Sequence, residues 1–245
     1  MQNIKLTIEY DGSRYEGWQQ PGKSASFHTI SGKISDVLYK MTREIISFNS
    51  GLRTEAGVHA YRQTINFKTE SSFSPEDFKT YLNRYLPMDI VITSAEAVPG
   101  DFHASLKAKD RTYLYQIVTG EVPSIFQRKY SWYTCFELDT DAMRAGADLL
   151  LGRHDFRCFS SGKSKKSSIQ TIYQLEIQQT QASVTIRIRS TNFLHNMARL
   201  LIGTLIDIGM GKRSPQDITA IFSGSQLPSA PCDPKGLILE DVSYS

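Results

Sequence analysis

Apolar and polar residues alternate along several short stretches of the chain, a pattern typical of half-buried β-strands. Residues 4–10, Ile-Lys-Leu-Thr-Ile-Glu-Tyr, show it most clearly, and the turn-forming residues Asp11-Gly12-Ser13 end it. Similar patterns or short apolar runs predict further strands at residues 45–48, 63–68, 90–97, 113–118, 132–136, 172–178, 184–189 and 237–242. The segments 172–178 and 184–189 are close enough in the chain to predict a hairpin.

In other stretches apolar residues recur three and four positions apart, which predicts amphipathic helices. One covers residues 29–41, and another begins with Ser74 as its N-cap and Pro75 in its first turn. Further helices are predicted at residues 139–151, 193–209 and 215–222. The first half therefore runs strand, helix, strand, strand, helix, strand, and the second half has a similar order. We expect an α+β protein with two similar domains, 1–104 and 105–245.

The predicted helix at residues 193–209 is apolar in nearly every direction around its axis, which is typical of a buried helix. Arg199 nevertheless lies within it. Because a buried guanidinium keeps its proton, burying it costs on the order of several kcal/mol unless an anion is paired with it. The helix therefore predicts a carboxylate or a bound phosphate beside Arg199.

Composition limits the class of protein. The 245 residues, 40% hydrophobic and 22% charged, are typical of a globular protein with one large domain or two ordinary ones. Because there is no run of about eighteen apolar residues and no signal-peptide core, we expect a cytoplasmic protein without a membrane span. The three cysteines are far apart, and no His or Cys pair has zinc-site spacing, so no metal is expected.

The net charge of +3 permits nucleic acid as a partner without requiring it. Basic residues gather at Lys107 and Lys109, and again at Lys163, Lys165 and Lys166 in a segment rich in Ser and Gly. Such groups are common on solvated surfaces, so each alone is weak evidence for an RNA-binding face.

Motifs in a fixed order give the chain a family resemblance. The segment Arg53-Thr54-Glu55-Ala56-Gly57-Val58-His59-Ala60 resembles the signature G-R-T-D-A-G-V-H-A of the tRNA pseudouridine synthase A (TruA) family. Further motifs that resemble the family's, in its order, are Tyr15-Glu16-Gly17-Trp18-Gln19, Asp101-Phe102-His103-Ala104, Arg111-Thr112-Tyr113-Leu114-Tyr115, Phe193-Leu194-His195-Asn196-Met197-Ala198-Arg199 and Gly236-Leu237-Ile238-Leu239. Together they extend over almost the whole chain.

The resemblance implies two α+β domains with mixed or antiparallel sheets joined across a central cleft, usually in a homodimer. It also implies an isomerase that uses neither cofactor nor metal. Such an enzyme breaks the bond between uracil and ribose, turns the base and rejoins it through carbon. The implied target is uridine at tRNA positions 38 to 40, in the anticodon arm.

The resemblance also implies roles for particular residues. Glu55 takes the position of the family's catalytic aspartate, which acts as nucleophile or base. Arg199 is its expected partner, since a neighbouring arginine favours the charged form of a carboxylate. Tyr113 is expected to stack on the target base and Arg53 to help hold the flipped-out state. The basic groups are expected to follow RNA phosphates.

Several positions depart from the family's pattern. Glu55 places its carboxylate one methylene further out than aspartate, on the order of 1 Å, and a displacement of that size lowers rates by about a hundredfold. Leu52 replaces a glycine, and Ser105 and Gln170 stand where the family has arginine. Two hypotheses follow: a working but divergent synthase, or a catalytically impaired paralogue that binds or chaperones RNA without isomerisation.

Overall fold

The computed structural model describes residues 1–19, 28–162 and 167–244 of the chain. The chain forms two compact units. Unit 1 consists of Met1–Lys109 with Leu239–Ser245, and unit 2 consists of Asp110–Ile238. Each unit combines helices with a sheet, so the predicted α+β class is confirmed.

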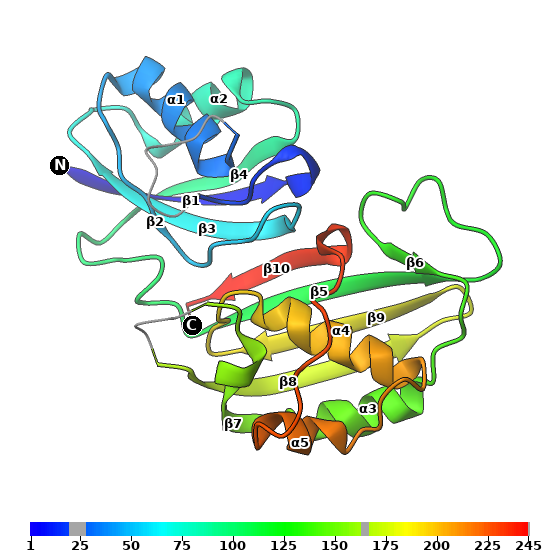
Figure 1. Ribbon diagram of the computed structural model, residues 1–245. Helices are drawn as coiled ribbons and strands as arrows, with labels where there is room; N and C mark the ends of the chain where they lie inside the picture. The colour runs from blue at the N-terminus through cyan, green and yellow to red at the C-terminus, as the bar shows by residue number, and fades with distance from the viewer. Residues whose placement is uncertain (20–27, 163–166, 245) are drawn as a thin grey trace. The chain divides into compact units, whose positions relative to one another are not determined.

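Unit 1 is built on a sheet whose central strand is β1 (Gln2–Tyr10). β1 pairs antiparallel with β4 (Ile90–Val98) on one side and β3 (His59–Thr69) on the other. β10 (Leu237–Ser243) follows β3 in the strand order, and the two-residue β2 (Asn49–Ser50) pairs with β3 outside that order. Two helices, α1 (Ile30–Thr42) and α2 (Pro75–Tyr85), cover one face of this sheet (Figure 1).

The core of unit 1 lies between these helices and β1. Ile4, Leu6 and Ile8 alternate along β1 and are fully buried, as the predicted strand requires. α1 begins where the Thr29 side chain accepts a hydrogen bond from the backbone N–H of Gly32. α2 begins with a capping box formed by Ser74 and Asp77, which satisfies backbone groups that a helix end leaves unpaired.

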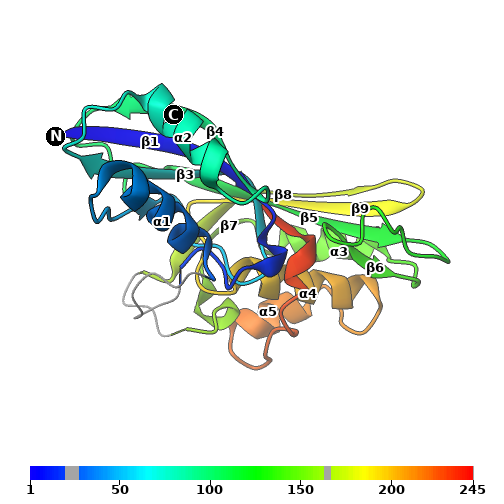
Figure 2. The same cartoon turned by 90° about the horizontal axis from the view of Figure 1, so that it is seen from above.

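The strands of unit 2 follow the order β5 (Asp110–Thr119), β9 (Ser183–Ser190), β8 (Ile169–Gln179) and β7 (Gly152–Asp155). These neighbours are antiparallel, and β8 and β9 form the predicted hairpin. The short β6 (Trp132–Thr134) pairs parallel with β5. Helices α3 (Thr140–Asp148), α4 (Met197–Gly209) and α5 (Asp217–Phe222) lie along one side of these strands (Figure 2).

Two expectations from the sequence were wrong in detail. Residues 45–48 do not form a strand, because α1 ends at Arg43 in a left-handed conformation and Ile45 then projects into solvent, 95% exposed. The helix expected from residue 193 begins only at Met197, because the preceding Asn196 has a φ of 60°. Left-handed backbone interrupts a helix at a residue that apolar periodicity does not reveal.

Helix α4 is buried on nearly all sides, as its apolar pattern predicts. Eleven of its thirteen residues are buried. Gly203 lies at its closest contact, where a Cβ atom would come within 2.1 Å of the carbonyl oxygen of Ala230. This helix therefore approaches the backbone of the segment before β10 more closely than any side chain permits.

The Gly203→Ala substitution tests this packing. Alanine raises helix propensity by about 1 kcal/mol over glycine, but the clash with a backbone oxygen is not relieved by a rotamer change. We expect the free energy of unfolding, measured by urea denaturation, to fall by about 2 kcal/mol. Gly100→Ala, at a position with open space around the added Cβ, serves as the control and should change it by less than about 0.5 kcal/mol. A Gly203→Ala protein as stable as the natural one would show that the packing is looser than described.

Candidate active site

The loop that carries Glu55 is fixed in unit 1 by a buried glutamine. The Gln63 side chain, fully buried on β3, donates to the carbonyl oxygen of Leu52 at 2.6 Å and accepts from the Leu52 backbone N–H at 3.4 Å. It also accepts from the backbone N–H of Thr64 at 3.1 Å. Leu52, the residue that departs from the family's glycine, is thus held at both of its backbone polar groups.

A second contact holds the middle of the loop. The hydroxyl groups of Tyr10 and Thr54 lie 2.7 Å apart, and both residues are buried. Burial raises the pKa of the Tyr10 hydroxyl well above its ordinary value of 10.0, against the smaller opposing effect of its hydrogen bonds. The Tyr10 hydroxyl therefore remains a neutral hydrogen-bonding group over the physiological pH range.

The segment from Gly12 to Trp18 lies directly against this loop. The Trp18 N–H donates to the Thr54 carbonyl at 3.0 Å, and the Gly57 N–H donates to the Tyr15 carbonyl at 3.2 Å. Gly17, with a φ of 91°, comes so close that a Cβ atom would lie 2.7 Å from the Thr54 carbonyl oxygen. Two motifs that are far apart in the sequence therefore meet through their backbones.

These contacts determine how the signature side chains are presented. Thr54 is buried, whereas Arg53 is exposed and Glu55 is half-buried. The Glu55 carbonyl accepts from the Val58 N–H at 3.2 Å across a turn in which Gly57 has a φ of 77°. The Arg53 side chain thus points to solvent and the Thr54 side chain into the protein, and the Glu55 backbone is part of a tight turn.

In unit 2, Tyr113 lies on β5 opposite Ile188 of β9 and is 2% exposed. Its ring meets that of Phe193 edge to face, with 5.0 Å between ring centroids and 72° between the planes. Aromatic pairs favour this arrangement, so Phe193 fixes the orientation of the Tyr113 ring. Phe193 belongs to the short segment before α4, outside the helix in which it was expected.

Arg199 occupies the first turn of α4 and is half-buried, not fully buried as its apolar surroundings predict. Its Nε donates to the carbonyl oxygen of Cys232 at 2.9 Å, and a terminal guanidinium nitrogen donates to Oδ1 of Asn196 at 3.2 Å. Both of these acceptors are neutral, so they orient the guanidinium without neutralising its charge. Glu55 belongs to unit 1 and Arg199 to unit 2, and their pairing stays a prediction.

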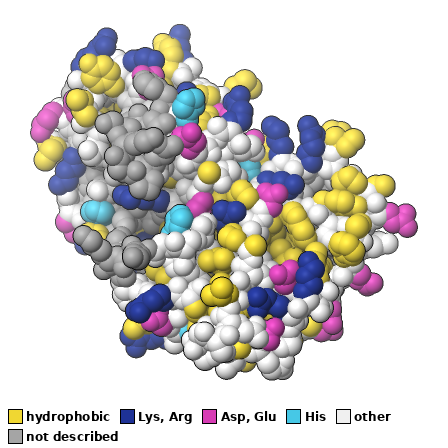
Figure 3. All heavy atoms as spheres, in the orientation of Figure 1, with side chains coloured by type: hydrophobic (Ala, Val, Ile, Leu, Met, Phe, Trp, Pro, Cys, Tyr) yellow, Lys and Arg dark blue, Asp and Glu magenta, His cyan; other side chains and the backbone are white. Residues whose placement is uncertain are grey.

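The basic residues singled out in the sequence differ in their surroundings. Lys107 forms an ion pair with Asp101 at 2.8 Å, whereas Lys109 is exposed and its side chain has no ion pair with the described residues. Lys163, Lys165 and Lys166 lie outside the described residues. On the face seen in Figure 3, Lys and Arg side chains are dispersed among acidic and apolar ones.

Gln170 and Ser105, the positions where the family has arginine, have local hydrogen bonds. The Gln170 side chain is buried, donates to the Ser167 carbonyl at 3.0 Å and accepts from the Thr191 hydroxyl at 2.9 Å. The Ser105 N–H donates to Nδ1 of His103 at 3.2 Å. Gln170 therefore stabilises the start of β8 within unit 2.

Residues 1–19, 28–162 and 167–244 contain neither a metal site nor a membrane-spanning helix. In that part of the chain no cluster of three or more His, Cys, Asp or Glu side chains has an arrangement that could hold a metal ion. None of its helices has both the length and the apolar character needed to cross a membrane. His59, which lies in the signature, instead accepts a hydrogen bond at Nδ1 from the Gly12 N–H at 3.1 Å.

Comparison with known proteins identifies the class to which this chain belongs as the pseudouridine synthases. The family described as "tRNA pseudouridine synthase" matches residues 6–106 and 147–245. The tRNA pseudouridine synthase A of Bacillus sp. (strain KSM-64) is 42% identical over all of both chains. Proteins named tRNA pseudouridine synthase A 2 are 41% identical in Bacillus cereus and 39% identical in Clostridium perfringens, again over the whole length of both chains.

The chain belongs to the tRNA pseudouridine synthase A family. Among solved structures, an archaeal box H/ACA sRNP Nop10-Cbf5 complex aligns with 84% of this chain and 42% of that chain, at 12% identity and a TM-score of 0.37.

The residues that hold the loop, Tyr10 and Gln63, were missed as functional positions in the sequence. One signal was present for Gln63, which lies in the same alternating phase of its strand as the apolar Ile65 and Phe67. A glutamine in the buried phase of a strand requires hydrogen-bond partners inside the protein. The sequence did not show that Leu52 would supply two of them.

The Tyr10→Phe substitution tests the contact with Thr54. It leaves a buried threonine hydroxyl without this partner, so we expect the free energy of unfolding at pH 7 to fall by about 1–3 kcal/mol. In the natural protein the folded-state pKa of Tyr10 is raised, so its contribution is full below pH 10 and is lost as the pH rises further. The difference between the two proteins should therefore narrow above about pH 10. Equal stability at pH 7, measured by urea denaturation, would contradict this role.

Proposed function

We propose that this protein isomerises uridine to pseudouridine in the anticodon arm of tRNA, at positions 38 to 40, with Glu55 as the catalytic carboxylate. The observation that carries the proposal is the signature loop, in which a glutamate stands at the family's carboxylate position on a backbone held by Gln63, Tyr10 and Trp18. Precise positioning of this kind is what a catalytic side chain requires. The enzyme works in the cytoplasm, without metal or cofactor.

The reaction rearranges bonds within one nucleotide. The bond between N1 of uracil and C1′ of ribose breaks, the base turns, and C5 becomes bonded to C1′. C5 then loses its proton and N1 gains one, so the product is an isomer of uridine. The Glu55 carboxylate acts on the ribose or on the uracil, either as a nucleophile or as a proton acceptor. Tyr113 stacks on the flipped-out base, Arg199 pairs with the carboxylate, and Arg53 holds the displaced strand.

The longer glutamate side chain is part of the proposal. Its carboxylate reaches on the order of 1 Å further than that of aspartate, which is enough to slow a reaction if the backbone does not compensate. Leu52, another departure from the family, precedes the signature and is held by Gln63 at both backbone groups. We propose that the backbone shifts at Leu52 to accommodate the longer Glu55 side chain, because the Gln63 side chain determines the backbone position there.

Substitution of Glu55 tests the chemistry. With tRNA tritiated at C5 of uridine, the natural protein should release tritium, and Glu55→Gln should lower the rate at least about a hundredfold because it removes the charge at constant size. Glu55→Asp should remain within about a hundredfold of the natural rate. Glu9→Gln, an exposed glutamate on β1, is the matched control and should leave the rate unchanged. A silent natural protein that gains activity as Glu55→Asp would overturn the proposal.

The RNA partner is tested by the salt dependence of tRNA binding. Each lysine that neutralises a phosphate contributes about 0.7 to 0.9 to the slope of log K against log salt concentration, the lower value applying to single strands. Lys109→Gln should lower the slope by about that amount, and Lys107→Gln by less, because Asp101 already offsets the charge of Lys107. Lys68→Gln, an exposed lysine on β3, should leave the slope unchanged. A slope near zero for the natural protein would argue against phosphate contacts altogether.

The proposal includes a homodimer. Val122, Ile125 and Phe126, in the segment of unit 2 between β5 and β6, are 77%, 69% and 94% exposed. Apolar and aromatic side chains of this kind are enriched in the cores of homodimer interfaces. We assign this segment to the contact with the second copy.

Lys163, Lys165 and Lys166 are proposed as further RNA contacts from the sequence alone.

A further inference from the structure

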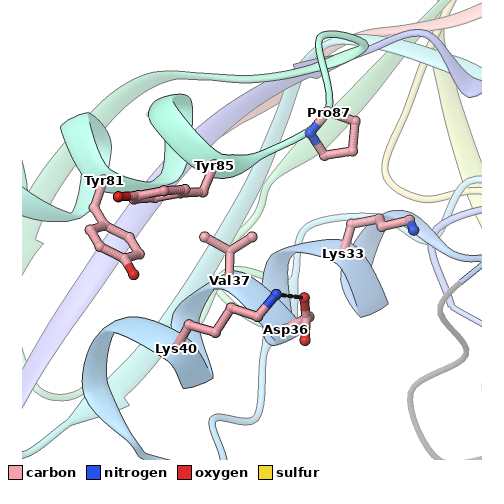
Figure 4. Close-up of a pocket in the computed structure, with 7 residues that line it drawn as sticks. All are labelled: Lys33, Asp36, Val37, Lys40, Tyr81, Tyr85 and Pro87. Atoms are coloured by element: carbon pink, nitrogen blue, oxygen red, sulfur yellow. Dashed lines mark hydrogen bonds and ion pairs between the residues drawn. The ribbon is translucent and has the colours of Figure 1, made fainter.

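A groove of about 360 Å³ lies between the two helices of unit 1 (Figure 4). It is lined from α1 by Lys33, Asp36, Val37 and Lys40, and from α2 and the residues after it by Tyr81, Tyr85 and Pro87. A space of this size is in the range of small-ligand sites, roughly 300–1,000 Å³.

The α2 side of the groove is an aromatic surface. The rings of Tyr81 and Tyr85 have centroids 4.6 Å apart, and Figure 4 shows Tyr85 edge-on above Val37, so that one ring face is turned toward the groove. Tyr85 is 53% exposed, and neither hydroxyl group hydrogen-bonds to another described residue. The guanidinium of Arg84 lies 5.5 Å from the centre of the Tyr85 ring and adds positive charge beside it.

The α1 side carries an excess of positive charge. Lys40 forms an ion pair with Asp36 at 2.7 Å, and Asp36 is the one acidic residue among those that line the groove. Lys33 forms no ion pair with the described part of the chain. A half-buried lysine without an ion pair, next to the partly exposed rings of Tyr81 and Tyr85, is a combination that binds single-stranded nucleic acid, with phosphates on the cation and bases on the rings.

We propose that this groove binds a segment of the RNA chain outside the target nucleotide, with a phosphate on Lys33 and a base against Tyr85. This rests on the proposed function, which supplies RNA as the partner. Within unit 1 the groove is tied to the signature loop, because the N-terminus of α1 donates from Ile30 and Ser31 to the carbonyls of Gly17 and Trp18. Trp18 in turn bonds to Thr54, next to Glu55.

That linkage favours RNA over a small molecule as the occupant. Lys33 lies one turn into α1, close to the end that contacts the segment holding Glu55. A strand whose target nucleotide reaches Glu55 can therefore continue along α1 into the groove. The groove adds affinity for RNA without contributing to the chemistry at Glu55.

The phosphate contact is tested by tRNA binding at several salt concentrations. Lys33→Gln should lower the slope of log K against log salt by about 0.7, as expected for one lost phosphate contact to a single strand. Lys68→Gln removes the same charge from another part of unit 1 and should leave the slope unchanged. Equal slopes for the two variants would overturn the assignment of Lys33.

The stacking contact is tested at fixed salt. Tyr85→Ala should weaken tRNA binding about tenfold, the order expected for one lost base contact. Tyr39→Ala removes a tyrosine of α1 that is 47% exposed and lies outside the groove, and should bind like the natural protein. Thermal unfolding of both variants checks that they are folded. Equal affinities for two folded variants would overturn the proposal and leave the groove to a partner other than RNA.

The two proposals fail separately. A natural protein that binds tRNA through the groove but releases no tritium refutes the isomerase function and supports the groove. A natural protein that releases tritium, while Lys33→Gln and Tyr85→Ala bind tRNA like their control variants, supports the isomerase function and refutes RNA binding in the groove. A natural protein that binds no tRNA refutes both.

Discussion

The close backbone contact between the Gly12–Trp18 segment and the signature loop is the constraint on which the candidate active site depends. Gly12 and Gly17 allow it, because a Cβ atom at Gly12 would lie 2.0 Å from the Val58 carbonyl oxygen. Hydrogen bonds from Trp18 and Gly57 then join the two segments. A loop held by backbone contacts on one side and by Gln63 on the other has little freedom to move the backbone that carries Glu55.

The Gly12–Trp18 segment also connects the Glu55 loop to helix α1. α1 begins where Ile30 and Ser31 bond to Gly17 and Trp18, so the position of the helix and that of the Glu55 loop are set by one segment. Because α1 lines the groove, the position of the groove relative to the Glu55 loop is fixed by the same hydrogen bonds. A rigid scaffold that carries functional loops at its edges is a common arrangement in enzymes.

In unit 2 the candidate site residues are oriented by side chains and carbonyl groups of that unit. Tyr113 is oriented by the ring of Phe193, and Arg199 by two neutral oxygen acceptors from its own unit. A guanidinium held this way keeps its full charge for an anion. An anionic partner for Arg199 remains a prediction. Because Arg199 is only half-buried, water reduces the cost of leaving its charge without such a partner.

Local patterns were sufficient for most of the elements. Alternation located β1 and the β8–β9 hairpin, the cap at Ser74 located α2, and apolar residues in every direction identified α4 as a buried helix. These features depend on side chains near one another in the sequence, so a short window contains the information. The signature motif likewise indicated the family, and the comparisons confirmed it.

The remaining features required contacts between distant residues. No local pattern tells that Gln63 binds the backbone of Leu52, that Ile45 has nothing to pack against, or that residues 239–245 return to unit 1. By itself the sequence determined the class of fold, the family and the identity of the candidate carboxylate. Only the tertiary structure decided how that carboxylate's loop is held and where α1 and α2 leave a groove, because both depend on close packing between segments far apart in the chain.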